Sequence, residues 1–130
     1  MSKFAQELSF AQRVAQEAGR IAMRYFDTGI AVDTKDDGSP VTKADKEVER
    51  YIREQIAEEF ADDGILGEEE GEVRRSERTW IVDPIDGTYN FARGIPIWST
   101  LIALEVEKEI VLGVVSAPAM QEFFYAVKGG

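Results

Sequence analysis

Two aspartates stand three positions apart at the end of an apolar run, in the stretch WIVDPIDGTYNF at residues 80–91. Asp83 follows a tryptophan, an isoleucine and a valine, so we expect it where the chain leaves a core. An ionised carboxylate in such a place is costly unless it is paired or bound to a metal. Asp86 precedes Gly87, and an Asp-Gly pair close after a proline is also common turn chemistry. A plain turn, however, leaves Asp83 unexplained.

The composition leaves only oxygen atoms for metal binding or nucleophilic chemistry, because the 130 residues include neither cysteine nor histidine. Thiolate ligands, imidazole ligands and the commonest general base are therefore excluded. The net charge of −10 argues against nucleic acid or an anionic membrane as a partner, unless cations intervene. No apolar run approaches a membrane span, and the start MSKFAQELSF lacks a signal-peptide core, so we expect a cytoplasmic protein.

Two further acidic segments have ordinary structural interpretations when each is taken alone. Glu68 begins the run of acids that follows GILG, and acidic loop residues are usually just solvated. Asp45 stands three positions after Thr42 in VTKAD. This spacing is typical of a capping box, in which the threonine oxygen binds a free helix amide and the acid faces the positive end of the helix dipole.

If these segments converge at the ends of neighbouring strands, the acidic cluster would repel itself unless a cation lay within it. Oxygen ligands from Glu68, Asp83 and Asp86 indicate Mg²⁺, with Mn²⁺ or Ca²⁺ less favoured. Gly87 would let the backbone approach a ligand closely, and Thr88 could begin a helical turn whose free amides bind an anion. The metal would reverse the local charge, so an acidic protein could accept a phosphate-bearing substrate.

The pattern of apolar residues predicts two helices followed by strands. The first helix should cover residues 3–27, with an apolar face formed by Leu8, Ala11, Ala15, Ala18, Ala22 and Phe26. After the polar loop or hairpin AVDTKDDGSPVT, the second should run over residues 42–61 and bury Val48, Tyr51, Ile52, Ile56 and Phe60.

From residue 64 onward, β-branched and aromatic runs predict strands at GILG, TWIVD, IWSTLIALEVE, IVLGVVSAP and EFFYAV. The charged run EEEGEVRRSER, residues 68–78, is typical of a solvated loop between strands. Two helices followed by strands predict an α+β domain in which the helices pack on a largely antiparallel sheet.

These motifs resemble those of the inositol monophosphatase family of Mg²⁺-dependent phosphatases. The resemblance is carried by GEE at residues 67–69 and by WIVDPIDGTYNF, with KDDGSPVTKAD before the second helix and GVVSAPA in the later strands. DGILGEE, RGIPIWSTLIALE and GVVSAPAM are most similar to the bacterial histidinol-phosphate phosphatase branch. The resemblance implies a sugar phosphatase fold and hydrolysis of L-histidinol phosphate to L-histidinol and phosphate in histidine biosynthesis, with inositol 1-monophosphate as the alternative substrate.

The resemblance also implies the ligands of a site that holds two or three Mg²⁺ ions, with Mn²⁺ as a substitute. Glu68, Asp83 and the backbone carbonyl of Ile85 would bind one ion. Asp83 would bridge to a second ion, which Asp86 would hold. The substrate would lie against Glu68, Ile85 and Asp86.

Catalytic roles are implied for three further side chains. The amides of Gly87 and Thr88 would bind the substrate phosphate, and Asp45 would act with the Thr88 hydroxyl to orient and deprotonate the attacking water. Lys35 would lie near the phosphate. No phosphoenzyme is needed, and the haloacid dehalogenase motif is excluded because its paired aspartates stand two positions apart. An EF-hand loop beginning at Asp83 is excluded because Gly94 stands at its twelfth position.

One family feature has no counterpart in these 130 residues. In the family, a later Trp-Asp segment supplies an aspartate that completes the second metal site, whereas here Ile81 follows one tryptophan and Ser99 the other. We therefore expect residues 1–130 to be a single domain that forms the N-terminal part of the phosphatase fold. Two function classes stay open: a phosphatase completed by another segment, and a non-catalytic fragment. Uncovered apolar faces would favour a homodimer, another homo-oligomer or association with the missing C-terminal half.

Overall fold

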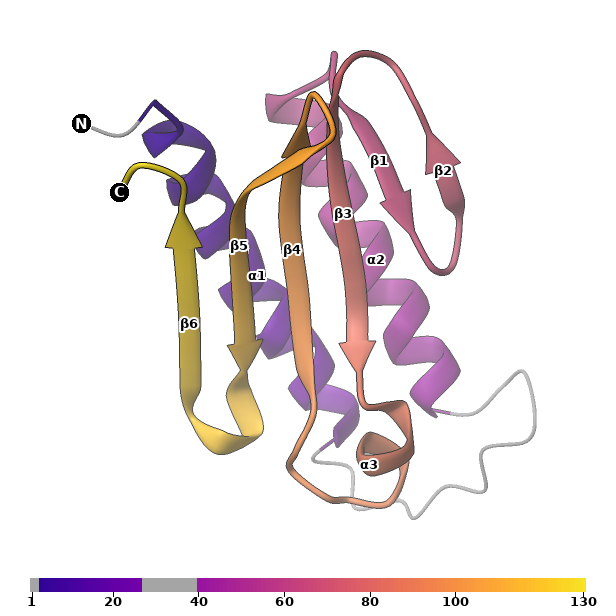
Figure 1. Ribbon diagram of the computed structural model, residues 1–130. Coiled ribbons are helices and arrows are strands. Elements are labelled where there is room, and N and C mark those ends of the chain that lie inside the picture. The colour runs from indigo at the N-terminus through magenta and orange to yellow at the C-terminus, as the bar shows by residue number, and fades with distance from the viewer. Residues whose placement is uncertain (1–2, 27–39) are drawn as a thin grey trace.

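The computed structural model describes residues 3–26 and 40–130, and it confirms two helices packed on a mixed, mostly antiparallel sheet (Figure 1). Helix α1 spans Ala5–Phe26 and helix α2 spans Pro40–Glu59, close to the predicted bounds. Lys35 and most of the polar segment before α2 lie outside the described residues. None of the helices in the described ranges combines the length and the apolar character that crossing a membrane requires.

The sheet has six strands in the order β2-β1-β3-β4-β5-β6. Their bounds are β1 Gly64–Gly67, β2 Gly71–Val73, β3 Arg78–Asp86, β4 Ser99–Val106, β5 Glu109–Ala117 and β6 Glu122–Val127. All neighbouring strands are antiparallel except β1 and β3, which run parallel. Helix α3, Thr88–Ala92, follows β3, and a 3-10 turn, Pro118–Met120, joins β5 to β6.

The charged run at residues 68–78 is not only a loop, because it contains strand β2 and the first residue of β3. Gly67 pairs with Gly71, so a three-residue turn connects β1 to β2. Gly71 has a φ of 76°, a left-handed conformation that such turns use and that glycine adopts without strain. Every residue of β2 is exposed, so the charges that suggested a loop do not oppose an edge strand.

Both long helices cover the same face of the sheet, and they lie behind it in Figure 1. Trp80, Val82, Ile102, Leu104 and Val114 pack beneath them and are almost completely buried. The periodic apolar residues of both helices reach this core, as predicted: Ala11, Ala15, Ala18, Ala22, Val48, Ile52 and Ile56 are buried, and Leu8, Phe26, Tyr51 and Phe60 pack against it.

The opposite face of the sheet carries an apolar row that neither α1 nor α2 covers. Asp83 pairs with Leu101, Leu101 with Val115, and Val115 with Phe124. These residues alternate with Val82 and the other core residues, so they point away from the helices. Phe124 is 55% exposed. This uncovered row ends at Asp83, which links the bare face of the sheet to the predicted site.

Candidate active site

The end of β3 contains an irregularity that explains the spacing of the two aspartates. Asp83 pairs with Leu101 and Asp86 pairs with Ser99, so three steps along β3 match two steps along β4. The extra residue is a bulge, and it places Asp86 on the same face as Asp83, although three steps in a regular strand would put them on opposite faces. Pro84 lacks an amide for the ladder, and its carbonyl accepts a hydrogen bond from the Thr100 hydroxyl at 2.8 Å.

Asp83 is a partly buried carboxylate at the end of β3. Its Oδ1 atom is buried and accepts no hydrogen bond from the described residues. Burial and the charges of Glu68, Asp86 and Glu49 raise the pKa of Asp83 from 3.8 to about 6. The charges of Glu68 and Asp86, the other two predicted carboxylate ligands, therefore act on Asp83, although Glu68 comes from the β1–β2 turn.

Asp45 lies in the same electrostatic environment, although it belongs to α2. Burial raises the pKa of Asp45 to about 7, and the charges of Glu69, Glu68, Asp83 and Glu49 add to the effect. Helix α2 begins at Pro40, so Thr42 and Asp45 both lie inside the helix. This boundary argues against the capping-box interpretation, in which Thr42 precedes the first helical residue.

Asp45 and Asp83 lie among acids whose charges would favour a nearby cation, but the described acids do not form a complete metal site. Within residues 3–26 and 40–130, no three acidic side chains are gathered closely enough to hold a metal ion. The raised pKa values of Asp45 and Asp83 and the unpartnered Asp83 Oδ1 nevertheless mean that a positive charge there would relieve repulsion and an unmet hydrogen-bonding need. The donor set therefore fits a hard cation, and the ligand assignment for Glu68, Asp83, Ile85 and Asp86 stays a prediction.

Gly87 and Thr88 begin helix α3 directly beside Asp86. Gly87 has a φ of 96°, and a Cβ atom on it would lie 3.1 Å from the Ile97 carbonyl oxygen, so glycine is required for both conformation and space. Helix α3 begins at Thr88, as predicted, and the Thr88 side chain is exposed. The Ile85 side chain is buried in the core, so only its backbone can serve a ligand.

A hollow of about 330 Å³ lies beside Asp86 and Gly87 on the uncovered face of the sheet. Val115, Phe124 and Trp98 form part of its wall. The Trp98 Nε1 atom is buried and donates no hydrogen bond to the described residues. The hollow thus joins the apolar row to the predicted phosphate-binding turn.

The described residues of the predicted site lie on elements that run toward one end of the sheet. The end of β3, helix α3 and the start of α2 lie at this end, at the bottom of Figure 1, and β1 runs toward it beside β3. Asp45, Glu68, Asp83 and Asp86 are coupled through their charges. Helix α3, which carries Thr88, contacts α2, which carries Asp45. Lys35 lies outside the described residues, so its predicted role has no structural test.

Sequence reasoning missed Glu49, which is completely buried beside this cluster. Its carboxylate accepts hydrogen bonds from the backbone amides of Glu69 and Glu70. A signal was present: Glu49 interrupts the apolar face of α2 one helical turn after Asp45. An acid at such a position needs a partner inside the protein.

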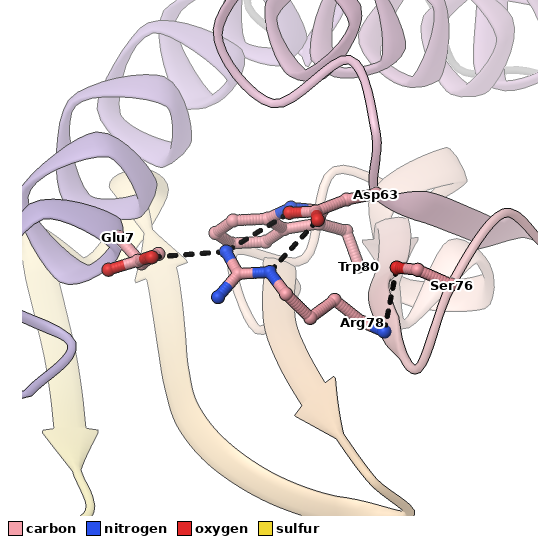
Figure 2. Close-up of polar contacts among 5 residues, drawn as sticks. All are labelled: Glu7, Asp63, Ser76, Arg78 and Trp80. Atoms are coloured by element: carbon pink, nitrogen blue, oxygen red, sulfur yellow. Dashed lines mark hydrogen bonds and ion pairs between the residues drawn. The ribbon is translucent and has the colours of Figure 1, made fainter.

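Asp63 is a second buried acid that sequence reasoning missed, and its role is structural. Figure 2 shows its carboxylate accepting a hydrogen bond from the Trp80 indole at 2.9 Å and two from the Arg78 guanidinium at 2.9 and 3.1 Å. Arg78 also bonds to Glu7 on α1, at 3.0 Å. Arg78 begins β3, whereas Asp83 and Asp86 lie near its other end, so this network joins α1 to the sheet away from the candidate site.

Comparisons with known proteins agree with this geometry. The model of the "Inositol monophosphatase family" matches residues 4–130. Proteins named "Histidinol-phosphatase" from Chlorobaculum parvum and Mycobacterium tuberculosis are 42% and 43% identical to this chain, and each match covers 95% of this chain and 48% of the relative. The solved structure of an inositol monophosphatase from Zymomonas mobilis is similar with a TM-score of 0.87 at 37% identity, over 99% of this chain and 50% of that one.

The chain spans about half the length of the curated relatives that it matches. The family match nevertheless covers almost all of the chain, and it includes the turn at Glu68 and the bulge between Asp83 and Asp86. The sequence, the arrangement of helices and sheet, and the convergence of the acidic segments agree. The chain belongs to the inositol monophosphatase family.

Proposed function

We propose that this chain carries the metal-binding half of a Mg²⁺-dependent phosphomonoesterase. The observation that carries the proposal is Asp83, whose partly buried carboxylate lies among other acids and has an oxygen that accepts no hydrogen bond from the part of the chain that the structure describes. A buried acid in this situation needs either a proton or a cation. The family is generally Mg²⁺-dependent, and the oxygen-only donor set suits Mg²⁺, with Mn²⁺ as a substitute.

The proposed roles of the site residues, as metal ligands or as phosphate-binding groups, follow from the element that carries each residue. Glu68, Asp83, Asp86 and the Ile85 carbonyl are the ligands. Bound Mg²⁺ would neutralise phosphoryl oxygens and lower the pKa of the attacking water. The amides at the start of α3, beginning with those of Gly87 and Thr88, would bind the phosphate, and Gly87 has no side chain to block it.

Asp45 would accept the proton of the attacking water. A pKa of about 7 in the metal-free protein is suitable for a general base at neutral pH. The Thr88 hydroxyl would orient the same water, which the contact between α2 and α3 favours. Lys35 remains a proposed neighbour of the phosphate.

L-histidinol phosphate is the substrate that we propose first. The support is that the two relatives at 42% and 43% identity are both named histidinol-phosphatase. Their matched segments include the whole candidate site. Inositol 1-monophosphate is the alternative, because the similar Zymomonas mobilis structure is an inositol monophosphatase. Both substrates are small phosphate monoesters, so the same metal and phosphate-binding groups would serve either.

Residues 1–130 are proposed to form one structural unit that needs a further segment for full activity. The support is the apolar row that ends at Asp83, since contiguous apolar patches that stay exposed often mark a contact surface. A C-terminal half of the domain covering this face would place additional ligands beside Asp83 and Asp86. The same face favours the second function class, a non-catalytic fragment that acts by association, with itself or with that half.

Calorimetric titration of Mg²⁺ into the metal-free chain tests the proposal. We expect the wild-type chain to bind and Asp83→Asn to lose binding. Asp62→Asn is the matched control, because Asp62 is exposed and the substitution removes the same charge. Equal binding by the wild type and Asp83→Asn would contradict the ligand assignment, and no binding by the wild type would contradict the metal proposal as a whole.

A further inference from the structure

The turn that carries Glu68 forms hydrogen bonds to one buried side chain from another element. Residues 68–70 connect β1 to β2 and are themselves exposed. Glu49 on α2 has none of its surface exposed. Its Oε1 accepts the amide of Glu69 at 2.9 Å, and its Oε2 accepts the amide of Glu70 at 2.9 Å. Two consecutive amides of an exposed turn are thus bound by a single carboxylate from a different element.

Arg53 completes this arrangement one helical turn further along α2. Its Nε donates to Glu49 Oε2 at 2.9 Å, so the buried charge is paired. Its Nη2 donates to the carbonyl of Gly71, the first residue of β2. Glu49 therefore binds the second and third residues of the turn, Glu69 and Glu70, and Arg53 binds Gly71, which follows them.

Gly67, the residue just before the turn, leaves the space that Glu49 occupies. A Cβ atom at this position would lie 2.5 Å from Glu49 Oε2, 2.6 Å from its Cδ and 2.7 Å from its Oε1. All three distances are shorter than any non-bonded contact that a side chain tolerates. The Glu49 carboxylate thus packs directly against the backbone of Gly67, and Glu68 lies between two residues that Glu49 immobilises.

We propose that Glu49 is a positioning residue that directs the Glu68 carboxylate toward Asp83. The inference rests on the proposed function, in which Glu68 is a metal ligand. Glu49 is not a ligand itself, because both of its oxygens already accept hydrogen bonds, in contrast to Asp83, whose Oδ1 accepts none from the described residues. Fixing the backbone on both sides of Glu68 limits the directions that its side chain can take.

Two substitutions disturb the contact between the Glu49 carboxylate and the β1–β2 turn in different ways. Glu49→Gln keeps the size of the side chain but turns one acceptor oxygen into a donor, which would face an amide or the Arg53 guanidinium. Gly67→Ala keeps the Glu49 charge and displaces its carboxylate sterically. Each should raise the Mg²⁺ dissociation constant by roughly tenfold to a hundredfold, as expected when the partners of a ligand are disturbed. Because both act through one contact, the double variant should lose little more than the worse single variant.

The measurements are calorimetric Mg²⁺ titration and amide hydrogen exchange resolved by NMR. Glu54→Gln is the matched control, since Glu54 is exposed on the same helix; it should bind Mg²⁺ like the wild type. Exchange of the Glu69 and Glu70 amides should be slow in the wild type, slower with saturating Mg²⁺, and fast in Glu49→Gln. The effect of Mg²⁺ on the exchange of these amides is measured in the wild-type chain. It therefore still tests the inference if Glu49→Gln fails to fold.

Three results would overturn the inference. Folded Glu49→Gln and Gly67→Ala chains that bind Mg²⁺ as the wild type does would make Glu49 a structural anchor only. Wild-type Glu69 and Glu70 amides that do not respond to bound Mg²⁺ would show that the turn and the metal are uncoupled. A wild-type chain that binds no Mg²⁺ would contradict the proposed function and this inference together, which separates that failure from the first two.

Discussion

The charge of Asp83 on β3 raises the pKa of Asp45 on α2, so two carboxylates from distant parts of the chain share one electrostatic environment. Burial is the larger cause, and Glu68, Glu69 and Glu49 contribute as well. The neighbouring acids therefore make it harder for Asp45 to lose its proton. A cation at this place would reverse the effect, so the protonation and the metal occupancy of the cluster should be linked.

Without metal, the cluster should make the protein less stable as pH rises. The pKa of Asp45 is about 7 and that of Asp83 about 6 in the folded chain, against 3.8 for the ordinary side chain. Between about pH 4 and pH 7 the folded state therefore binds more protons than the unfolded state, and the free energy of unfolding falls as pH rises. Urea unfolding of wild type and Asp45→Asn with a chelator present should show that the variant loses less stability across this range.

The comparison with Asp45→Asn isolates the effect from carboxylates elsewhere in the protein. Asp62→Asn serves as the control, because Asp62 is exposed and the variant should follow the wild-type pH dependence. Parallel curves for the wild type and Asp45→Asn would show that Asp45 carries no raised pKa. Saturating Mg²⁺ should reduce the wild-type loss of stability at neutral pH, since it replaces the repulsion with attraction.

Asp45 and Thr88 should act together on the attacking water in any active form of the protein. Asp45→Asn and Thr88→Ala should each lower turnover, Thr88→Ala should leave Mg²⁺ affinity nearly unchanged, and the double variant should lose less than the two losses combined. Steady-state kinetics on L-histidinol phosphate and calorimetry on the same samples measure both quantities. If Asp45→Asn lowers only the melting temperature, its role is structural.

Asp63 should matter for stability and not for metal binding. Asp63→Asn would remove the more buried of the two carboxylates that bind the Arg78 guanidinium and weaken the bond to the Trp80 indole. Removing one partner of such a buried pair costs about 3 kcal/mol in the free energy of unfolding. Urea unfolding should show a loss of this order, whereas Mg²⁺ titration of the folded variant should match the wild type. A change below about 0.5 kcal/mol, the usual range for surface substitutions, would make the network energetically neutral.

The helices and most strands follow from the sequence because their apolar residues recur at the periods of helix and sheet. Four of the five predicted apolar runs match strands to within two residues at each end, and the run TWIVD lies within the longer β3. The charged segment at 68–78 was wrong as a simple loop, because an edge strand exposed along its whole length needs no apolar alternation. An apolar period reveals which residues are buried, and no residue of β2 is buried.

The details of the site depend on contacts between elements, which a linear pattern does not contain. Pro84 was visible as a ladder breaker, but the bulge that puts Asp83 and Asp86 on one face appears only in the pairing of β3 with β4. Similarly, the partners of Glu49 are amides some twenty positions away. The acid types and their spacing indicated which chemistry to expect, whereas the groups that position them could be identified only from the fold.

Counting ligands against the proposed reaction predicts that the isolated 130-residue chain is nearly inactive. As proposed ligands, Glu68, Asp83, Asp86 and the Ile85 carbonyl would hold one ion well and a second only in part. A two-metal phosphoryl transfer needs both the attacking and the leaving oxygen stabilised, and an incompletely held second ion would be poorly placed. We expect phosphate release from L-histidinol phosphate to be barely above background, although Mg²⁺ binds.

Supplying the other half of the domain should restore hydrolysis, since the chain matches about half of each histidinol-phosphatase relative. The C-terminal half of such a relative, fused to this chain, should increase turnover and tighten Mg²⁺ dependence. Phe124→Lys on the uncovered row should weaken this restoration when the two halves are separate polypeptides, while Mg²⁺ binding to the chain alone stays unchanged. The control is Glu58→Lys on α2, because Glu58 is exposed and its helix covers the other face of the sheet. If the short chain releases phosphate as fast as the fusion, the second metal site needs no further ligand and its assignment must be withdrawn.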